Sequence, residues 1–230
     1  MSAFEYIIRR KLDDVNLLQK VDLDAILEDI KMRLGEKDLA RIGNLGSGSW
    51  ASVFWLSNRR KVVKVTHDPQ DAQASAVVLK RPSKYLVKTY DVFALTPDKY
   101  TVYCIVNEKL TPLGRREELL IPVLLRLLKQ SGQNHSITME TYDAIIKLLE
   151  KFRGRDWKSW LNSYLAAQHL NMDADSFMDF YKNMAEALDS RGIRWWDIKK
   201  ANFMMRGHQI VISDLGAGTV TGAPKIPSLT

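Results

Sequence analysis

Residues 194–203 read RWWDIKKANF, in which Asp197 is followed by Lys199 and Asn202. A carboxylate held close to a hydroxyl group can accept its proton, and a lysine two residues further on can stabilise a phosphoryl group during its transfer. The side-chain oxygen of an asparagine is a ligand that Mg²⁺ accepts. The spacing therefore suggests phosphoryl-transfer chemistry, although an isolated Asp–Asn pair in a loop more often has a structural role.

A second acidic motif follows twelve residues after Asn202. Asp214 lies in ISDLGAG, at the predicted end of a short strand. A carboxylate at this position would complete a magnesium site together with Asn202. The order of DIKKAN, a predicted hairpin with strands at 203–206 and 209–213, and then DLG makes coincidence a poor explanation.

A glycine-rich stretch and a strand lysine lie upstream. The stretch IGNLGSGSWASV contains Gly46 and Gly48, which lack a Cβ and so allow backbone N–H groups to approach a phosphate closely. Lys64 lies in VVKV, and because Val63 and Val65 must share one face of a strand, the lysine points to the other face. Separately, these features suit an ordinary hairpin and a solvent-facing strand position. Together they suggest a site for nucleotide phosphates.

The spacing of the apolar residues changes twice along the chain. Helical spacing predicts two short helices within residues 4–34, packed onto the body of the protein. Short stretches rich in β-branched and aromatic residues then predict an antiparallel sheet interrupted by one weak helix, and helical spacing returns from Glu117 onward. The expected strands are 52–57, 61–66, 89–95 and 100–106, the weak helix is 70–80, and the later helices are 117–130, 138–153, 156–169 and 174–190.

Composition limits the class of protein. With 46% hydrophobic and 27% charged residues, the 230-residue chain has the composition of a soluble globular protein with one large domain or two lobes. The net charge of +7 is concentrated in residues 41–109, and this excess suits a nucleotide, a nucleic acid or an acidic protein as well as an ordinary solvated surface. The single Cys104 lies in the apolar run YTVYCIV, so we expect a buried thiol and a reducing compartment. No signal peptide and no membrane-spanning run is expected.

In this order the motifs resemble those of the eukaryotic-type protein kinase family. GNLGSGSWASV is similar to the glycine-rich loop, VVKV to the strand lysine, DIKKAN to the catalytic loop and SDLG to the magnesium-binding motif, all within residues 42–218. The resemblance implies ATP and Mg²⁺ as cofactors. It also implies an α+β, two-lobed kinase-like fold with an N-terminal helical extension (1–38), a small antiparallel β N-lobe (39–110) and a reduced, mainly helical C-lobe (111–230) that carries a helical insertion.

The resemblance further implies a role for each matched residue. Asp197 would be the catalytic base, and Lys199 would steady the γ-phosphate. Asn202 and Asp214 would hold Mg²⁺. The nucleotide-binding positions would be Gly46, Gly48, Lys64, Glu108 and Leu110, the last two through backbone groups that meet adenine.

Two departures from the family pattern affect these expectations. Trp195 and Trp196 stand where the family usually carries His-Arg, so we expect both rings to serve packing and do not expect regulation by loop phosphorylation. No glutamate lies between the strand lysine and the hinge, so the usual partner of that lysine is missing. Asp71 or Gln73, on the predicted weak helix, is the candidate replacement.

The lysine two residues after the aspartate is similar to that of serine/threonine kinases, and the abbreviated plan resembles their compact bacteriophage members. We therefore expect ATP- and Mg²⁺-dependent transfer to serine or threonine of proteins, and to the chain itself. The candidate partners include acidic or nucleic-acid-associated host proteins, in the cytoplasm of a host if the chain is viral. Membrane association and direct nucleic-acid binding are not expected.

Two other hypotheses stay open at this point. The missing glutamate motivates a pseudokinase, which would keep the fold and inhibit or recruit a partner. The charge of +7 and the six tryptophans allow a basic nucleic-acid-binding protein, although no nucleic-acid-binding motif is present.

Overall fold

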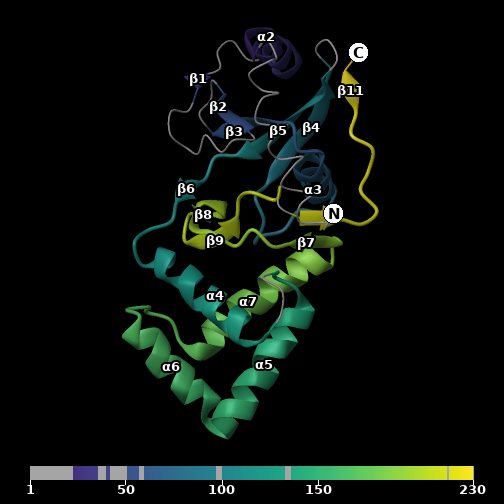
Figure 1. Ribbon diagram of the computed structural model, residues 1–230. Coiled ribbons are helices and arrows are strands. Elements are labelled where there is room, and N and C mark those ends of the chain that lie inside the picture. Colours follow the sequence, from purple (N-terminus) through teal and green to yellow (C-terminus); the bar gives the residue numbers. More distant parts are fainter. Residues whose placement is uncertain are drawn as a thin grey trace. The chain divides into compact units, whose positions relative to one another are not determined.

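The computed structural model divides into two compact units (Figure 1). Unit 1 comprises Met1–Lys80, Lys88–Lys109 and Pro224–Thr230, and unit 2 comprises Arg81–Val87 and Leu110–Ala223. An antiparallel sheet dominates unit 1 and helices dominate unit 2, so the predicted two-lobed α+β fold class is confirmed. The structure describes residues 23–35, 40–41, 51–56, 60–96, 100–132, 136–216 and 218–229.

Unit 1 is built on a six-stranded sheet with the order β1-β2-β3-β5-β4-β11. Neighbouring strands are antiparallel except β11, which runs parallel to β4. The longer strands lie within two residues of the predicted ranges, because their β-branched and aromatic stretches suit a pleated, half-buried surface. The strands are β1 (Ala40–Arg41), β2 (Ala51–Trp55), β3 (Lys61–Thr66), β4 (Thr89–Leu95), β5 (Val102–Glu108) and β11 (Ser228–Leu229).

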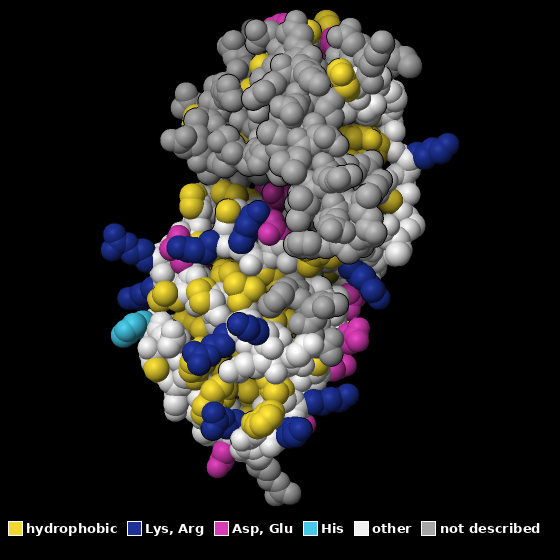
Figure 2. Space-filling model, viewed as in Figure 1, with side chains coloured by type: hydrophobic (Ala, Val, Ile, Leu, Met, Phe, Trp, Pro, Cys, Tyr) yellow, Lys and Arg dark blue, Asp and Glu magenta, His cyan; other side chains and the backbone are white. Residues whose placement is uncertain are grey.

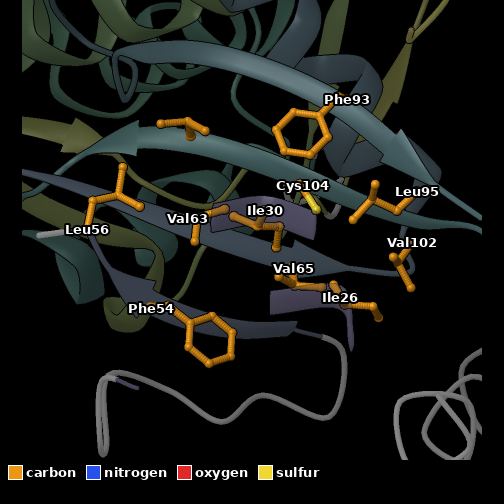
Figure 3. Packing of buried hydrophobic residues seen from close by; sticks show 11 residues of the cluster. Ile26, Ile30, Phe54, Leu56, Val63, Val65, Phe93, Leu95, Val102 and Cys104 are labelled. Carbon is orange, nitrogen blue, oxygen red and sulfur yellow. The ribbon is translucent and has the colours of Figure 1, made fainter. Parts of the chain in front are cut away.

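One face of this sheet is covered by α2 (Leu23–Leu34) (Figure 3). Ile26 and Ile30, one helical turn apart, are buried against apolar side chains of the sheet that include Val63 and Val65. The guanidinium group of Arg33 lies 4.5 Å from the centre of the Phe93 ring, which ties the last turn of the helix to β4. The second predicted N-terminal helix and its packing are therefore confirmed. The first lies outside the described residues.

The other face of the sheet is covered by α3 (Pro69–Lys80). The side chain of Asp68 accepts a hydrogen bond from the Gln70 N–H at 2.9 Å, and Pro69 occupies the first helical position, so capping chemistry defines where the helix begins. Small residues such as Ala72 and Ala76 allow α3 to approach the sheet closely. The predicted weak helix at 70–80 is thus present.

The last segment of the chain also packs on this second face. Ile226 contacts the cluster formed by Ala72, Ala76, Val92 and Ile105. The Ala94 N–H donates to the Pro227 carbonyl oxygen at 2.8 Å, which begins the pairing of β11 with β4.

Unit 2 contains four longer helices, all close to their predicted ranges. Thr138 forms a capping box with Thr141 before α5, and the Asp173 carboxylate accepts from the Ser176 N–H at 2.7 Å before α7. Asp173 lies in the polar stretch NMDAD (171–175), which separates α6 from α7. The helices are α4 (Leu120–Gln130), α5 (Met139–Arg153), α6 (Trp157–Ala167) and α7 (Ala174–Asp189).

Short strands complete unit 2. β7 (Ile193–Trp195) pairs with β10 (Gly218–Val220), and β8 (Phe203–Arg206) lies between β6 (Thr111–Pro112) and β9 (Gln209–Ile212). The β8–β9 hairpin matches the predicted strands at 203–206 and 209–213. No helix among the described residues is long and apolar enough to cross a membrane.

The segment Arg81–Val87 belongs to unit 2 because side chains of that unit bind its backbone. The guanidinium group of Arg206 donates to the carbonyl oxygens of Lys84 and Leu86, at 3.0 and 2.8 Å. Leu86 also forms a parallel bridge with Ile212, the last residue of β9. The chain that follows α3 is therefore fixed directly beside the strand that leads to Asp214.

Candidate active site

The loop 196–202 is held at both ends by buried aromatic rings. Trp195 ends β7 and Phe203 begins β8, and their rings meet edge to face with centroids 5.5 Å apart. The predicted packing role is confirmed for Trp195, which is fully buried. It is wrong for Trp196, which is 40% exposed, because the chain turns out of β7 at that residue.

Within this loop the side chains of Asp197, Lys199 and Asn202 meet. The Lys199 Nζ lies 2.6 Å from Asp197 Oδ2, and the Asn202 Nδ2 donates to the same oxygen at 2.8 Å. Asn202 also donates to the Asp197 carbonyl oxygen at 2.8 Å, and it is only 3% exposed. The side chain of Asp197 keeps 33% of its surface exposed, so its carboxylate is oriented and still accessible to solvent.

Asp214 lies at the open end of the β8–β9 hairpin, next to Asn202. Phe203 pairs with Ile212, and beyond this pair the Ser213 N–H donates to the Asn202 carbonyl oxygen at 2.8 Å. The Asp214 Oδ1 accepts from the Gly216 N–H at 3.0 Å, which fixes the orientation of its carboxylate. The hairpin thus brings together the two residues predicted to bind a metal.

The chemistry of these two donors fits Mg²⁺, a hard cation that prefers oxygen ligands. The nitrogen end of the Asn202 amide faces Asp197, so its oxygen end points elsewhere and can act as a ligand. In the described part of the chain, no cluster of three or more His, Cys, Asp or Glu side chains could hold a metal by itself. Two protein oxygens supplemented by phosphate oxygens are, however, a common environment for Mg²⁺ in nucleotide sites.

Gly218 fixes the return of the chain to β7 after Asp214. It pairs with Trp195, and a Cβ at this position would lie 2.6 Å from the carbonyl oxygen of Arg194. Only glycine allows β10 to approach β7 this closely. The sequence analysis missed this role, for which the second glycine after Asp214 was the available signal.

Lys200 provides another contact that the sequence analysis missed. Its ammonium group forms an ion pair with Glu118, in the short 3₁₀ helix Glu117–Leu119 that precedes α4. The catalytic-loop candidate is therefore attached to the helical part of unit 2. Lys200 and Glu118 are 82 residues apart, so no periodic pattern in the sequence could predict that they form an ion pair.

In unit 1, Lys64 forms an ion pair with Asp71. The Lys64 Nζ lies 2.6 Å from Asp71 Oδ2, and the two side chains are 14% and 4% exposed. Lys64 lies opposite Ile105 in the sheet, on the face covered by α3, as the alternation of VVKV predicts. Of the two candidates for the missing glutamate, the structure pairs Asp71 with the lysine.

The end of β5 carries the predicted hinge residues. The Glu108 N–H donates to the Lys88 carbonyl oxygen at 2.9 Å, and the Glu108 carboxylate accepts from the Lys88 N–H at 2.7 Å. Leu110 is buried. A contact of Glu108 or Leu110 with adenine stays a prediction, and the predicted phosphate-binding residues Gly46 and Gly48 lie outside the described residues.

No protein-family model and no curated protein matches this chain. Solved structures of aminoglycoside phosphotransferases are similar to it at low identity. The structure of APH(3'')-Id from Streptomyces rimosus is 13% identical with a TM-score of 0.38, over 86% of this chain and 78% of that one. A thermostable mutant of APH(4)-Ia is 14% identical, with a TM-score of 0.38 for the apo form over 82% of this chain and 70% of that one.

The ternary complex of the APH(4)-Ia mutant with AMP-PNP and hygromycin B has a TM-score of 0.39 and 14% identity, over 83% of this chain and 70% of that one. Similarity at this level does not assign an activity.

Proposed function

We propose that this protein is an ATP- and Mg²⁺-dependent phosphotransferase that transfers the γ-phosphate to serine or threonine hydroxyl groups of proteins. The observation that carries the proposal is the Asp197 carboxylate, which Lys199 and Asn202 orient within one loop while it stays accessible. Phosphoryl transfer requires positioning and charge neutralisation more than covalent chemistry, so a few fixed polar groups suffice.

The contacts of Asp197 suggest how its two oxygens divide their roles. Lys199 and Asn202 both contact Oδ2, so we assign Oδ1 as the proton acceptor. Asp197 takes the proton of the substrate hydroxyl group while the hydroxyl oxygen bonds to the γ-phosphorus and ADP leaves. Lys199, in the middle of this loop and 57% exposed, stabilises the negative charge of the transferring group.

Asn202 and Asp214 are the residues that would hold Mg²⁺, which supplies neutralisation of the phosphate charge when bound. Lys64 would contact the nucleotide phosphates, and Asp71 would keep its ammonium group in place. The presence of all four groups, Lys64, Asp197, Asn202 and Asp214, supports an enzyme over a pseudokinase. A protein that only binds a partner has no chemical need for the complete set.

The test is transfer of labelled phosphate from γ-labelled ATP, with and without Mg²⁺, to the protein itself, to mixed protein substrates and to small hydroxyl compounds including an aminoglycoside. We expect labelled phosphoserine or phosphothreonine, and a loss of about a hundredfold or more in Asp197→Asn with little change in nucleotide affinity. Asp214→Asn should abolish the Mg²⁺-dependent transfer. The matched control is Asp179→Asn, which removes one charge from an exposed position on α7.

Each outcome decides between alternatives. Label on small hydroxyl compounds alone would replace the protein-kinase proposal with a small-molecule kinase. Nucleotide binding without any transfer by the unaltered protein would favour the pseudokinase. Unchanged transfer in Asp197→Asn would contradict the role assigned to the loop.

A further inference from the structure

A groove of about 400 Å³ lies in the helical part of unit 2, away from the residues assigned to catalysis. Its walls come from the end of α4, the last turns of α5 and the first turns of α6. Leu148 and Phe152 are one helical turn apart on α5, as are Leu149 and Arg153, so these four side chains line one side of that helix. The groove is lined by Gln130, Leu148, Leu149, Phe152, Arg153 and Trp160. We call it the α5–α6 groove.

The α5–α6 groove presents apolar surface that the fold does not use. Phe152 is 66% exposed, although burial of a phenylalanine side chain away from water is favourable. Beside it, Leu148 is half-buried and Leu149 is buried, so an aliphatic floor lies next to an exposed ring. A large apolar side chain from another molecule could cover Phe152 and contact this floor.

Cations surround the apolar surface. Arg153 lies with its guanidinium carbon 4.6 Å from the centre of the Trp160 ring, and Lys151 lies with its Nζ 5.5 Å from the centre of the Phe152 ring. Exposed Lys129 is in the last turn of α4. No acidic side chain lines the groove, whose lining carries the single charge of Arg153; exposed Glu150 on α5 and Asp156 in the turn before α6 lie outside the lining. The charge around the groove is therefore complementary to an acidic ligand.

The aromatic residues favour a peptide over a nucleic acid. Single-stranded nucleic acids bind through bases that stack on accessible aromatic faces. The Trp160 ring already stacks on Tyr164, with centroids 5.4 Å apart, and is contacted by Arg153. The exposed ring that remains, Phe152, lies beside Leu148 and Leu149, and the volume suits one or two apolar side chains.

We infer that the α5–α6 groove binds an acidic segment of a partner protein, with an aliphatic or aromatic side chain inserted beside Phe152 and carboxylates of the segment paired with Arg153, Lys129 and Lys151. The binding itself is independent of the chemistry at Asp197. Its use for docking a substrate rests on the proposed phosphotransferase function, because docking would raise the effective concentration of a hydroxyl group near the catalytic loop.

Binding is tested without nucleotide, by fluorescence anisotropy of labelled peptides with the full chain. The probes are peptides that share a central Leu-Ser-Ser-Phe and carry flanks of glutamate, lysine or serine, and a labelled oligothymidylate. We expect the glutamate-flanked peptide to bind about tenfold or more tightly than the others, and its affinity to fall as salt rises.

The variants are Phe152→Ala and Arg153→Glu, both at exposed positions where the fold should tolerate the change. Each should weaken binding of the glutamate-flanked peptide by about tenfold or more. The matched controls are Met32→Ala, at an exposed apolar residue of unit 1, and Lys147→Glu, which changes the charge on α5 outside the groove; both should bind like the unaltered protein. Circular dichroism verifies that each variant is folded.

Equal binding of all peptides, no binding of any peptide, or binding that survives both variants would overturn the inference. Tighter binding of oligothymidylate, lost in Arg153→Glu, would replace it with a nucleic-acid site. The two proposals can fail separately. Binding of the acidic peptide without phosphoryl transfer would support the groove proposal and contradict the phosphotransferase proposal. Transfer to generic proteins without peptide binding would support the phosphotransferase proposal and contradict the groove proposal.

Discussion

At the scale of single residues, the ion pair between Lys64 and Asp71 identifies the partner of the strand lysine. Both charges are largely removed from water, and a buried charge is stable only when it is paired. An aspartate side chain is one methylene shorter than a glutamate, and the alanines of α3 allow the helix to lie close enough for the shorter side chain to reach. The contact of Asp71 with Lys64 therefore depends on the small alanine side chains of α3 as well as on the aspartate itself.

This pair leads to a double-mutant prediction. Lys64→Ala and Asp71→Ala should each lower the phosphate-transfer rate strongly, and the double variant should lose little more than either single variant, because the two side chains act as one unit. The measurement is the initial rate of label transfer at saturating Mg²⁺, with Gln73→Ala as the control on the same helix. Additive losses would show that the pair has no joint role.

At the scale of secondary-structure elements, the pairing of β7 with β10 fixes the loop and the Asp214 segment from outside. The chain leaves β7 after Trp195 and returns to it at Gly218. The β8–β9 hairpin lies between these two points and brings Asn202 and Asp214 to its open end. Two short strand pairs therefore hold the candidate catalytic residues.

Gly218→Ala tests this arrangement. The added methyl group would meet the backbone of Arg194, which cannot move aside as a flexible side chain can, so we expect a destabilisation of about 1–3 kcal/mol and a reduced transfer rate. Thermal unfolding and label transfer measure the two effects. Gly114→Ala is the control, because its Cβ would meet only the Glu117 side chain, which can rotate away. An unchanged melting temperature in Gly218→Ala would show that β10 tolerates displacement from β7.

The elements also show what the sequence could and could not predict. The longer helices and strands were predicted because they are long enough for a period of 3.6 or 2 residues to repeat. β6, β7 and β10 have two or three residues each, so they carry no period and depend on pairing with distant segments. In the candidate site, fixed spacing predicted that Asp197, Lys199, Asn202 and Asp214 belong together, whereas the choice of Asp71 over Gln73 depends on how α3 packs.

At the scale of the whole molecule, unit 1 is assembled from three separate stretches of the chain. Cys104, the single cysteine of the sequence, lies in the core that α2 forms with the sheet and is fully buried. Burial raises the pKa of its thiol from 9.0 to about 12, while Arg33 opposes the shift and Asp29 and Asp91 add to it. Below pH 9.0 the thiol is protonated in both the folded and the unfolded state, so its ionisation does not change stability. As the pH rises from 9.0 toward about 12, the thiol ionises first in the unfolded chain, and the stability of the folded state therefore falls.

Thiol labelling therefore reports the opening of unit 1. At about pH 8 the folded protein should have only on the order of one thiolate in ten thousand, in addition to being shielded, so a disulfide reagent should react only after the unit opens. Nucleotide with Mg²⁺ should slow the reaction further, because a bound ligand stabilises the folded state. Cys104→Ser with Met32→Cys is the control and should react at once, since Met32 is 75% exposed. Fast labelling of the unaltered protein would contradict the buried position.

The place of β11 in the sheet has a consequence for synthesis on the ribosome. The segment Pro224–Leu229 is translated after all of unit 2, at roughly 5–20 residues per second. Until it emerges, the outer edge of β4, including the Ala94 N–H, has no strand to pair with, and such an edge can bind another nascent chain. The β-sheet unit can thus complete its fold only after unit 2 has been translated, when this segment covers the edge.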